Sequence, residues 1–139
     1  MGILRVISYL GEILSLKSTP SGILLAGYNT IERVEITLAN AAVGTNILYS
    51  TAVPAGQVWA LEQADCRNVN NGSVNSYIFI APTNVILYQV LNTIANQNVF
   101  WTGLLHVKAT ERVGFIWYGC VLNDDLYAHF SYRKILVPT

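Results

Sequence analysis

The spacing of hydrophobic and polar positions changes near residue 31, and the change divides the chain into two parts. Before residue 17, large apolar side chains recur every three or four positions, with Arg5, Ser8, Glu12 and Ser15 between them. At about 100° per residue, this spacing lines up apolar side chains along one side of a helix. The members of this apolar stripe are Ile3, Val6, Ile7, Leu10, Ile13 and Leu14. An amphipathic helix is therefore predicted over residues 3–16, although Ile, Val and Tyr would also suit a strand.

Residues 18–22 read Ser-Thr-Pro-Ser-Gly, a composition that ends a helix and forms a linker. We therefore divide the chain into an N-terminal arm with its linker, residues 1–22, and a β-sandwich domain, residues 23–139. A single helix of this length is only marginally stable in water. The apolar stripe must then dock on the domain's own sheet, on sister subunits or on another protein, and the linker favours docking on a partner.

From residue 31 onward, apolar and polar positions alternate in three segments. They are residues 33–38, 104–110 and 127–133, and alternation of this kind puts the apolar side chains on one face of a sheet. Uninterrupted apolar runs at 77–81, 85–91 and 113–121 are predicted to be strands that are covered on both faces. Turn-forming clusters at 54–56, 70–72, 82–84, 96–98 and 123–125 separate about eight short strands. An all-β sandwich or barrel is the predicted fold.

Composition narrows the function classes. Charged residues make up 12% of the chain and apolar residues 53%, against roughly 25% charged in average proteins. Lys and Arg form no cluster that could displace counterions from phosphate, so no nucleic-acid partner is expected. No apolar stretch approaches the ~20 residues of a membrane span, and Arg5 and Glu12 interrupt the N-terminal apolar region, so neither a membrane partner nor a signal peptide is expected. So few charges leave apolar area exposed, which favours contacts with other protein subunits.

The residue types that carry catalysis or bind metals are sparse. His106 and His129 both fall on the polar positions of alternating strands, and no third metal ligand accompanies them. Cys66 and Cys120 lie among apolar or alternating residues and are expected to be free, buried thiols rather than a disulfide. Asp124-Asp125 is the only acidic pair and is expected in a solvated loop. No nucleophile elbow, phosphate loop or dinucleotide fingerprint is present. The sequence thus predicts no catalytic residue, no metal and no cofactor, and a protein that is not an enzyme.

Aromatic and amide side chains leave one alternative open. Trp59, Trp101 and Trp117, with eight tyrosines, could stack on sugar rings, and the asparagines at 68–75 and 92–98 could bind a glycan. The same aromatic residues are more typical of a core or a subunit interface. Asparagine equally suits turns with positive φ. We expect structural roles for these residues, and a bound glycan remains possible.

The order of three segments resembles a known group of proteins. A hairpin at Val53-Pro54-Ala55-Gly56-Gln57-Val58-Trp59 comes first, then an aromatic strand at residues 114–119 and a last strand ending Phe130-Ser131-Tyr132-Arg133-Lys134-Ile135. Over residues 31–137, this order is similar to the small jelly-roll structural proteins of tailed bacteriophages, namely capsid decoration (cement) proteins or the heads of short fibres.

The resemblance implies a jelly-roll-like antiparallel β-sandwich with a short N-terminal helical arm. It further implies a homotrimer that binds the major capsid protein or other virion proteins and stabilises the phage head. Localisation would be the virion, after synthesis in the host cytoplasm. The alternative function is a carbohydrate- or receptor-binding β-sandwich of a phage fibre or tail.

Overall fold

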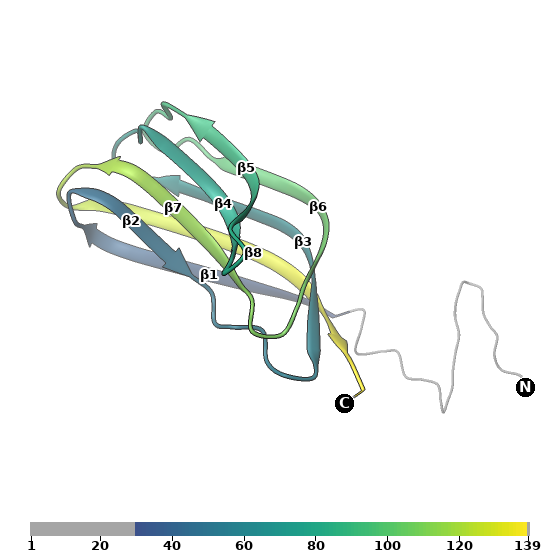
Figure 1. Ribbon diagram of the computed structural model, residues 1–139. Helices are drawn as coiled ribbons and strands as arrows, with labels where there is room; N and C mark the ends of the chain where they lie inside the picture. Colours follow the sequence, from purple (N-terminus) through teal and green to yellow (C-terminus); the bar gives the residue numbers. More distant parts are fainter. Residues whose placement is uncertain (1–29, 139) are drawn as a thin grey trace, which may run out of the picture.

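A computed structural model describes residues 30–138, which form a sandwich of two four-stranded antiparallel sheets (Figure 1). The strands are β1 (Ile31–Ala41), β2 (Gly44–Tyr49), β3 (Gln57–Asn68), β4 (Asn75–Ala81), β5 (Val85–Leu91), β6 (Val99–Val107), β7 (Arg112–Cys120) and β8 (Asp124–Leu136). The prediction of an all-β domain with about eight strands is confirmed. The predicted helical arm and its apolar stripe lie outside the described residues.

The strands are distributed between the sheets in the order of a jelly roll. One sheet runs β1-β8-β3-β6 and the other β2-β7-β4-β5, so the chain crosses between the sheets after every strand except β4, which forms a hairpin with β5. The turns β1–β2, β3–β4, β5–β6 and β7–β8 gather at the end of the sandwich that lies away from the C-terminus (Figure 1). We call this end the loop end.

Alternation along the sequence correctly predicted which side chains face the core. Val34, Ile36 and Leu38 of β1 pack against the buried cluster between the sheets. On β8, Ala128 and Phe130 are buried in the same cluster. Each strand thus contributes its apolar positions to one core, and burying a large apolar side chain there contributes about 1.5–3 kcal/mol.

Two details of the strand predictions are wrong. The run 85–91 was expected to be covered on both faces, but β5 is an edge strand, and Val85, Ile86, Tyr88 and Leu91 are all exposed. The segment 104–110 was expected to be strand throughout, but β6 ends at Val107. A tight turn follows, in which the Glu111 N–H donates to the Lys108 carbonyl at 3.0 Å and Thr110 has φ 75°.

Both cysteines are free and buried, as expected from their apolar surroundings. Burial is the main cause that raises the pKa of the Cys66 thiol and of the Cys120 thiol above the ordinary value. Since the thiolate is the reactive form, neither residue should react with a thiol reagent in native buffer, while both should react in denaturant. Labelling followed by mass spectrometry tests this. Rapid native labelling of Cys66 would show that β3 opens readily, contrary to its central position.

Candidate functional site

The two sheets differ sharply in charge. Among the residues of β2, β4, β5 and β7, only Arg112 is charged, and it lies at the start of β7. The opposite sheet carries Glu32, Arg33, Glu35, Glu62, Asp65, Arg67, Asp124, Asp125, Arg133 and Lys134. The β1-β8-β3-β6 sheet therefore carries charged side chains that water can solvate, whereas the β2-β7-β4-β5 sheet carries almost none.

Charged groups on the outer face of the β1-β8-β3-β6 sheet interact with one another. His129 Nδ1 lies 3.1 Å from Asp65 Oδ1, and Arg133 Nε donates to Glu62 Oε2. The Arg67 guanidinium carbon lies 4.8 Å from the centroid of the Tyr127 ring. Such pairs are typical of a solvated surface and each contributes little to stability.

The outer face of the β2-β7-β4-β5 sheet is mostly apolar. Ile47, Ile116 and Tyr77 stand opposite one another in one row across β2, β7 and β4, and the polar Gln89 of β5 ends this row. Tyr49, Gly114, Phe79 and Ile86 form the next row, which extends to β5. We call the large side chains of these two rows the apolar face: Ile47, Tyr49, Tyr77, Phe79, Ile86 and Ile116.

Aromatic contacts hold the apolar face together. The Phe79 ring centroid lies 5.6 Å from that of Tyr77 and 6.0 Å from that of Tyr49, both in edge-on geometry. A Cβ atom on Gly114 would come within 2.6 Å of the Phe79 ring, so glycine leaves the space that this ring occupies. Ile47, Tyr49 and Ile86 remain exposed to solvent around this centre. Phe79 and Ile116 are themselves buried, and the exposed members lie on the edge strands β2 and β5. Exposed apolar side chains grouped on one face are typical of contacts with other proteins.

The loop end adds a second group of exposed apolar side chains. Ile94 is 71% exposed and Val43 69% exposed, and Val74, Val121 and Leu122 are also exposed. None of the residues in these four turns is charged. Backbone hydrogen bonds join neighbouring turns: the Asn92 N–H donates to the Val74 carbonyl, and the Asn96 N–H donates to the Asn68 carbonyl. The loop end therefore presents apolar side chains on a framework that is held by hydrogen bonds.

Asp124 lies inside the loop end, which corrects the expectation of a solvated acidic pair. Its side chain is fully buried and accepts hydrogen bonds from the Asn68 and Asn71 side-chain amides and the Val121 N–H. Burial alone would raise the pKa of Asp124. The three hydrogen bonds outweigh burial, and the pKa of Asp124 lies below its ordinary value. This carboxylate ties the β3–β4 loop to the β7–β8 turn and plays a structural role.

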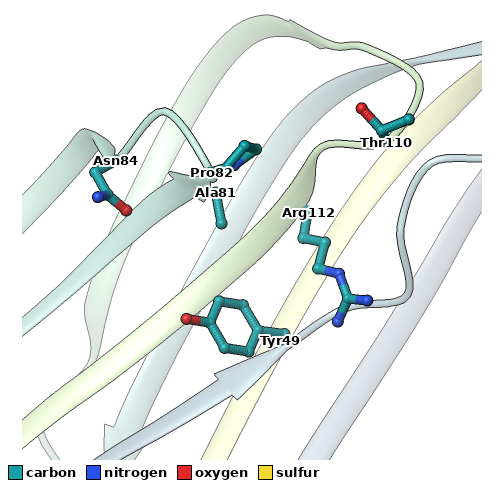
Figure 2. Close-up of a pocket in the computed structure, with 6 residues that line it drawn as sticks. All are labelled: Tyr49, Ala81, Pro82, Asn84, Thr110 and Arg112. Atoms are coloured by element: carbon teal, nitrogen blue, oxygen red, sulfur yellow. The ribbon is translucent and has the colours of Figure 1, made fainter.

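A pocket of about 460 Å³ lies at the end of the sandwich opposite the loop end (Figure 2). Its lining residues are Tyr49, Ala81, Pro82, Asn84, Thr110 and Arg112. The Arg112 guanidinium carbon lies 6.0 Å from the centroid of the Tyr49 ring. Both turns that border the pocket are fixed by the backbone, because the Asn84 N–H donates to Ile80 and the Thr110 N–H donates to Val53.

The residues that the sequence suggested for chemistry are not brought together. His106 stands opposite Ala60 while His129 stands opposite Asp65, so the two imidazoles lie in different rows and on strands separated by β3. Within residues 30–138, no group of three His, Cys, Asp or Glu side chains could hold a metal ion. Trp59 and Trp117 are buried in the core, as expected. No helix in this part of the chain is long and apolar enough to cross a membrane.

Comparison with known proteins adds similarity of architecture only. No protein-family model and no curated protein matches the chain. A chain of the Bacillus endospore appendages, described as disulfide-linked pili, is 12% identical with a TM-score of 0.42, covering 84% of this chain and 97% of that chain. The virus-like particle of the Macrobrachium rosenbergii extra small virus gives 11% identity and a TM-score of 0.43, covering 94% and 95%. A CBM4 structure gives 9% identity and a TM-score of 0.29, covering 75% and 83%. At these identities, none of the three carries a functional conclusion.

Proposed function

We propose that this protein is a structural subunit of a virion and acts by contact with other protein subunits. The single observation that carries the proposal is the β2-β7-β4-β5 sheet, whose outer face is mostly apolar and whose strands hold one charged residue. In a lone monomer the exposed members of the apolar face, Ile47, Tyr49 and Ile86, would stay in contact with water. Covering it with another protein surface removes that apolar area from water at about 25 cal/mol per Å².

The specific form of the proposal is a homotrimeric capsid decoration protein. Jelly-roll sandwiches are the architecture of many viral capsid domains, although lectins and cupins also use it. The described residues hold no group of ligands for a cupin-type metal. Three copies around one axis would place the apolar face of each against a neighbour. The loop end, whose four turns hold no charged residue, would remain for the major capsid protein. The predicted apolar stripe of the N-terminal arm would add a further contact.

Replacing Ile47 and Ile86 together by lysine tests the role of the apolar face. Both side chains are exposed, so the fold should persist, but each lysine would place an unpaired charge in the proposed interface. We expect a trimer for the wild type and at least a 100-fold weaker association for the double variant, since two such charges cost about 3 kcal/mol or more. Sedimentation equilibrium measures the association, and circular dichroism checks the fold.

Leu104→Lys is the matched control, because Leu104 is 68% exposed and lies on β6 of the opposite sheet. This variant should associate as the wild type does. A monomeric wild type at tens of micromolar would contradict self-assembly, and a trimeric double variant would exclude the apolar face as the interface. A density map of the particle that carries the chain would then test the virion role itself.

A carbohydrate-binding function is the second candidate, and the pocket beside Arg112 favours it. The pocket has an exposed aromatic ring next to amide, hydroxyl and guanidinium groups. This combination is typical of a shallow ligand site, in which a few polar groups fix the ligand's orientation. Tyr49 belongs both to the apolar face and to this pocket, so the second candidate requires a surface around Tyr49 that no neighbouring subunit covers.

A further inference from the structure

Four polar side chains line the pocket, and their polar groups have no hydrogen-bond partners in residues 30–138. They are the Tyr49 hydroxyl, the Asn84 amide, the Thr110 hydroxyl and the Arg112 guanidinium. Figure 2 shows Arg112 lying beside Tyr49, with Asn84 and Pro82 on the opposite side of the pocket. Backbone hydrogen bonds fix both bordering turns, so the backbone that carries Asn84 and Thr110 is in place before any ligand arrives.

Arg112 determines the charge of a matching ligand. No carboxylate forms an ion pair with Arg112 among the described residues, and the side chain of the adjacent Glu111 is engaged by the Lys108 N–H at 2.8 Å. A guanidinium presents a planar pair of donors that suits the two oxygens of a carboxylate. With a single cation at the site, a ligand of charge −1 fits better than a doubly charged phosphate.

The other lining residues indicate the chemistry of the rest of the ligand. The Tyr49 ring is 43% exposed and offers a flat apolar surface next to the guanidinium. The C–H face of a pyranose can lie on such a ring. The Asn84 amide both donates and accepts hydrogen bonds, as does the Thr110 hydroxyl, and these groups match sugar hydroxyls.

We infer that this pocket binds an acidic monosaccharide unit, a pyranose ring that carries a carboxylate. Arg112 holds the carboxylate, Tyr49 supports the ring, and Asn84 and Thr110 contact its hydroxyls. The inference rests on the carbohydrate-binding candidate function, for which it names the ligand class.

The probes are methyl glycosides of glucuronic, galacturonic and N-acetylneuraminic acid, with methyl glucoside and methyl galactoside as neutral counterparts and acetate as a carboxylate without a ring. Titration of the ¹⁵N-labelled full chain by NMR should shift the amide signals of Tyr49, Asn84, Thr110 and Arg112. At least one acidic glycoside should bind about tenfold or more tightly than the neutral glycosides and than acetate. Raising the ionic strength should weaken this binding.

Variants then test the assigned roles. Arg112→Gln should weaken binding of the acidic glycoside at least tenfold and leave binding of any neutral sugar unchanged. Tyr49→Ala should weaken binding of both kinds of sugar, whereas Tyr49→Phe should weaken binding of neither. Matched controls are Arg33→Gln and Tyr88→Ala, whose exposed side chains lie away from the pocket. Both should bind as the wild type does.

Each outcome has a defined meaning. Equal affinity for acidic and neutral glycosides would overturn the acidic ligand class but keep the carbohydrate-binding function. Acetate binding as tightly as the glycosides would overturn the role of the ring. If no glycoside binds at 20 mM, both the inference and the carbohydrate-binding candidate fail, whereas the proposed subunit assembly is tested separately by sedimentation.

Discussion

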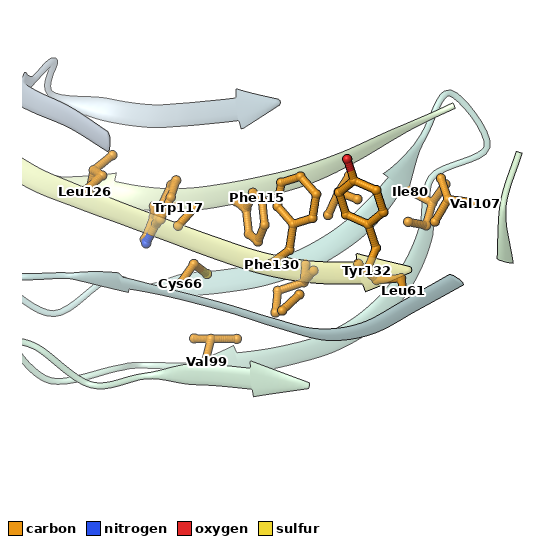
Figure 3. Close-up of a cluster of buried hydrophobic side chains, with 14 of the residues drawn as sticks. Leu61, Cys66, Ile80, Val99, Val107, Phe115, Trp117, Leu126, Phe130 and Tyr132 are labelled. Carbon is orange, nitrogen blue, oxygen red and sulfur yellow. The ribbon is translucent and has the colours of Figure 1, made fainter. Parts of the chain in front are cut away.

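Phe130→Ala should cost about 3–5 kcal/mol of the free energy of unfolding, a large part of what a domain of this size possesses. Phe130 is fully buried on β8, in the middle of the core (Figure 3). Its ring lies 6.1 Å from Trp59, 5.9 Å from Tyr132 and 6.3 Å from Phe115, measured between centroids. Truncation to alanine removes these contacts and leaves a cavity between two sheets that cannot close around it. With an m-value of about 2 kcal/mol per molar urea, the midpoint of urea unfolding should fall by roughly 2 M.

Phe100→Ala provides the matched control for this effect. Phe100 has the same chemistry but is 46% exposed on β6, an edge strand. Its removal should cost less than about 1 kcal/mol, because nearly half of the side chain already contacts water and no closed cavity would be left. Both variants must be measured at the wild-type protein concentration, since subunit association adds to apparent stability. Equal losses for Phe130 and Phe100 would contradict the position of the core.

The fold was largely predictable from the sequence because its main determinants are local. Alternation in 33–38 and 127–133 fixes which side chains of β1 and β8 point inward, and the turn clusters separate the strands. The continuous apolar runs were harder to interpret. Residues 77–81 and 85–91 look alike in sequence, yet Ile78 and Ile80 of β4 are buried while Val85 and Ile86 of β5 are exposed. The burial of these side chains depends on whether their strand is central or at the edge of the sheet. That position is set by long-range strand pairing.

The candidate sites were harder to predict because their residues come from distant segments. The pocket combines β2, the β4–β5 turn, the β6–β7 turn and the first residue of β7. The apolar face requires the register of four strands before Tyr49, Phe79 and Ile86 fall into one row. No local sequence pattern predicts the pocket or the apolar face. The low share of charged residues did indicate exposed apolar area, and the register shows where that area lies.

Asp124→Ala should also destabilise the fold, by about 3 kcal/mol at pH 7. The variant leaves the Val121 N–H and the amides of Asn68 and Asn71 without their acceptor in a buried site. Asp125→Ala is the control, since within residues 30–138 the Asp125 side chain accepts one exposed hydrogen bond, from the Asn40 N–H at 3.2 Å. That variant should lose less than about 1 kcal/mol. Urea unfolding at pH 7 measures both, and equal losses would contradict a special role for Asp124.

The pH dependence of the free energy of unfolding separates the contribution of the Asp124 charge from that of its side-chain shape. Because the pKa of Asp124 is lowered in the folded state, its carboxylate contributes stability that is fully present above the unfolded pKa of about 3.9. This contribution is lost as pH falls through the lower folded pKa. Asp124→Asn keeps the size of the side chain but does not titrate, and should lose about 1–2 kcal/mol at pH 7. The difference between wild type and Asp124→Asn should therefore shrink when unfolding is repeated below about pH 3. A difference that stays constant with pH would show that the amide's wrong hydrogen-bond geometry, and not the lost charge, destabilises the variant.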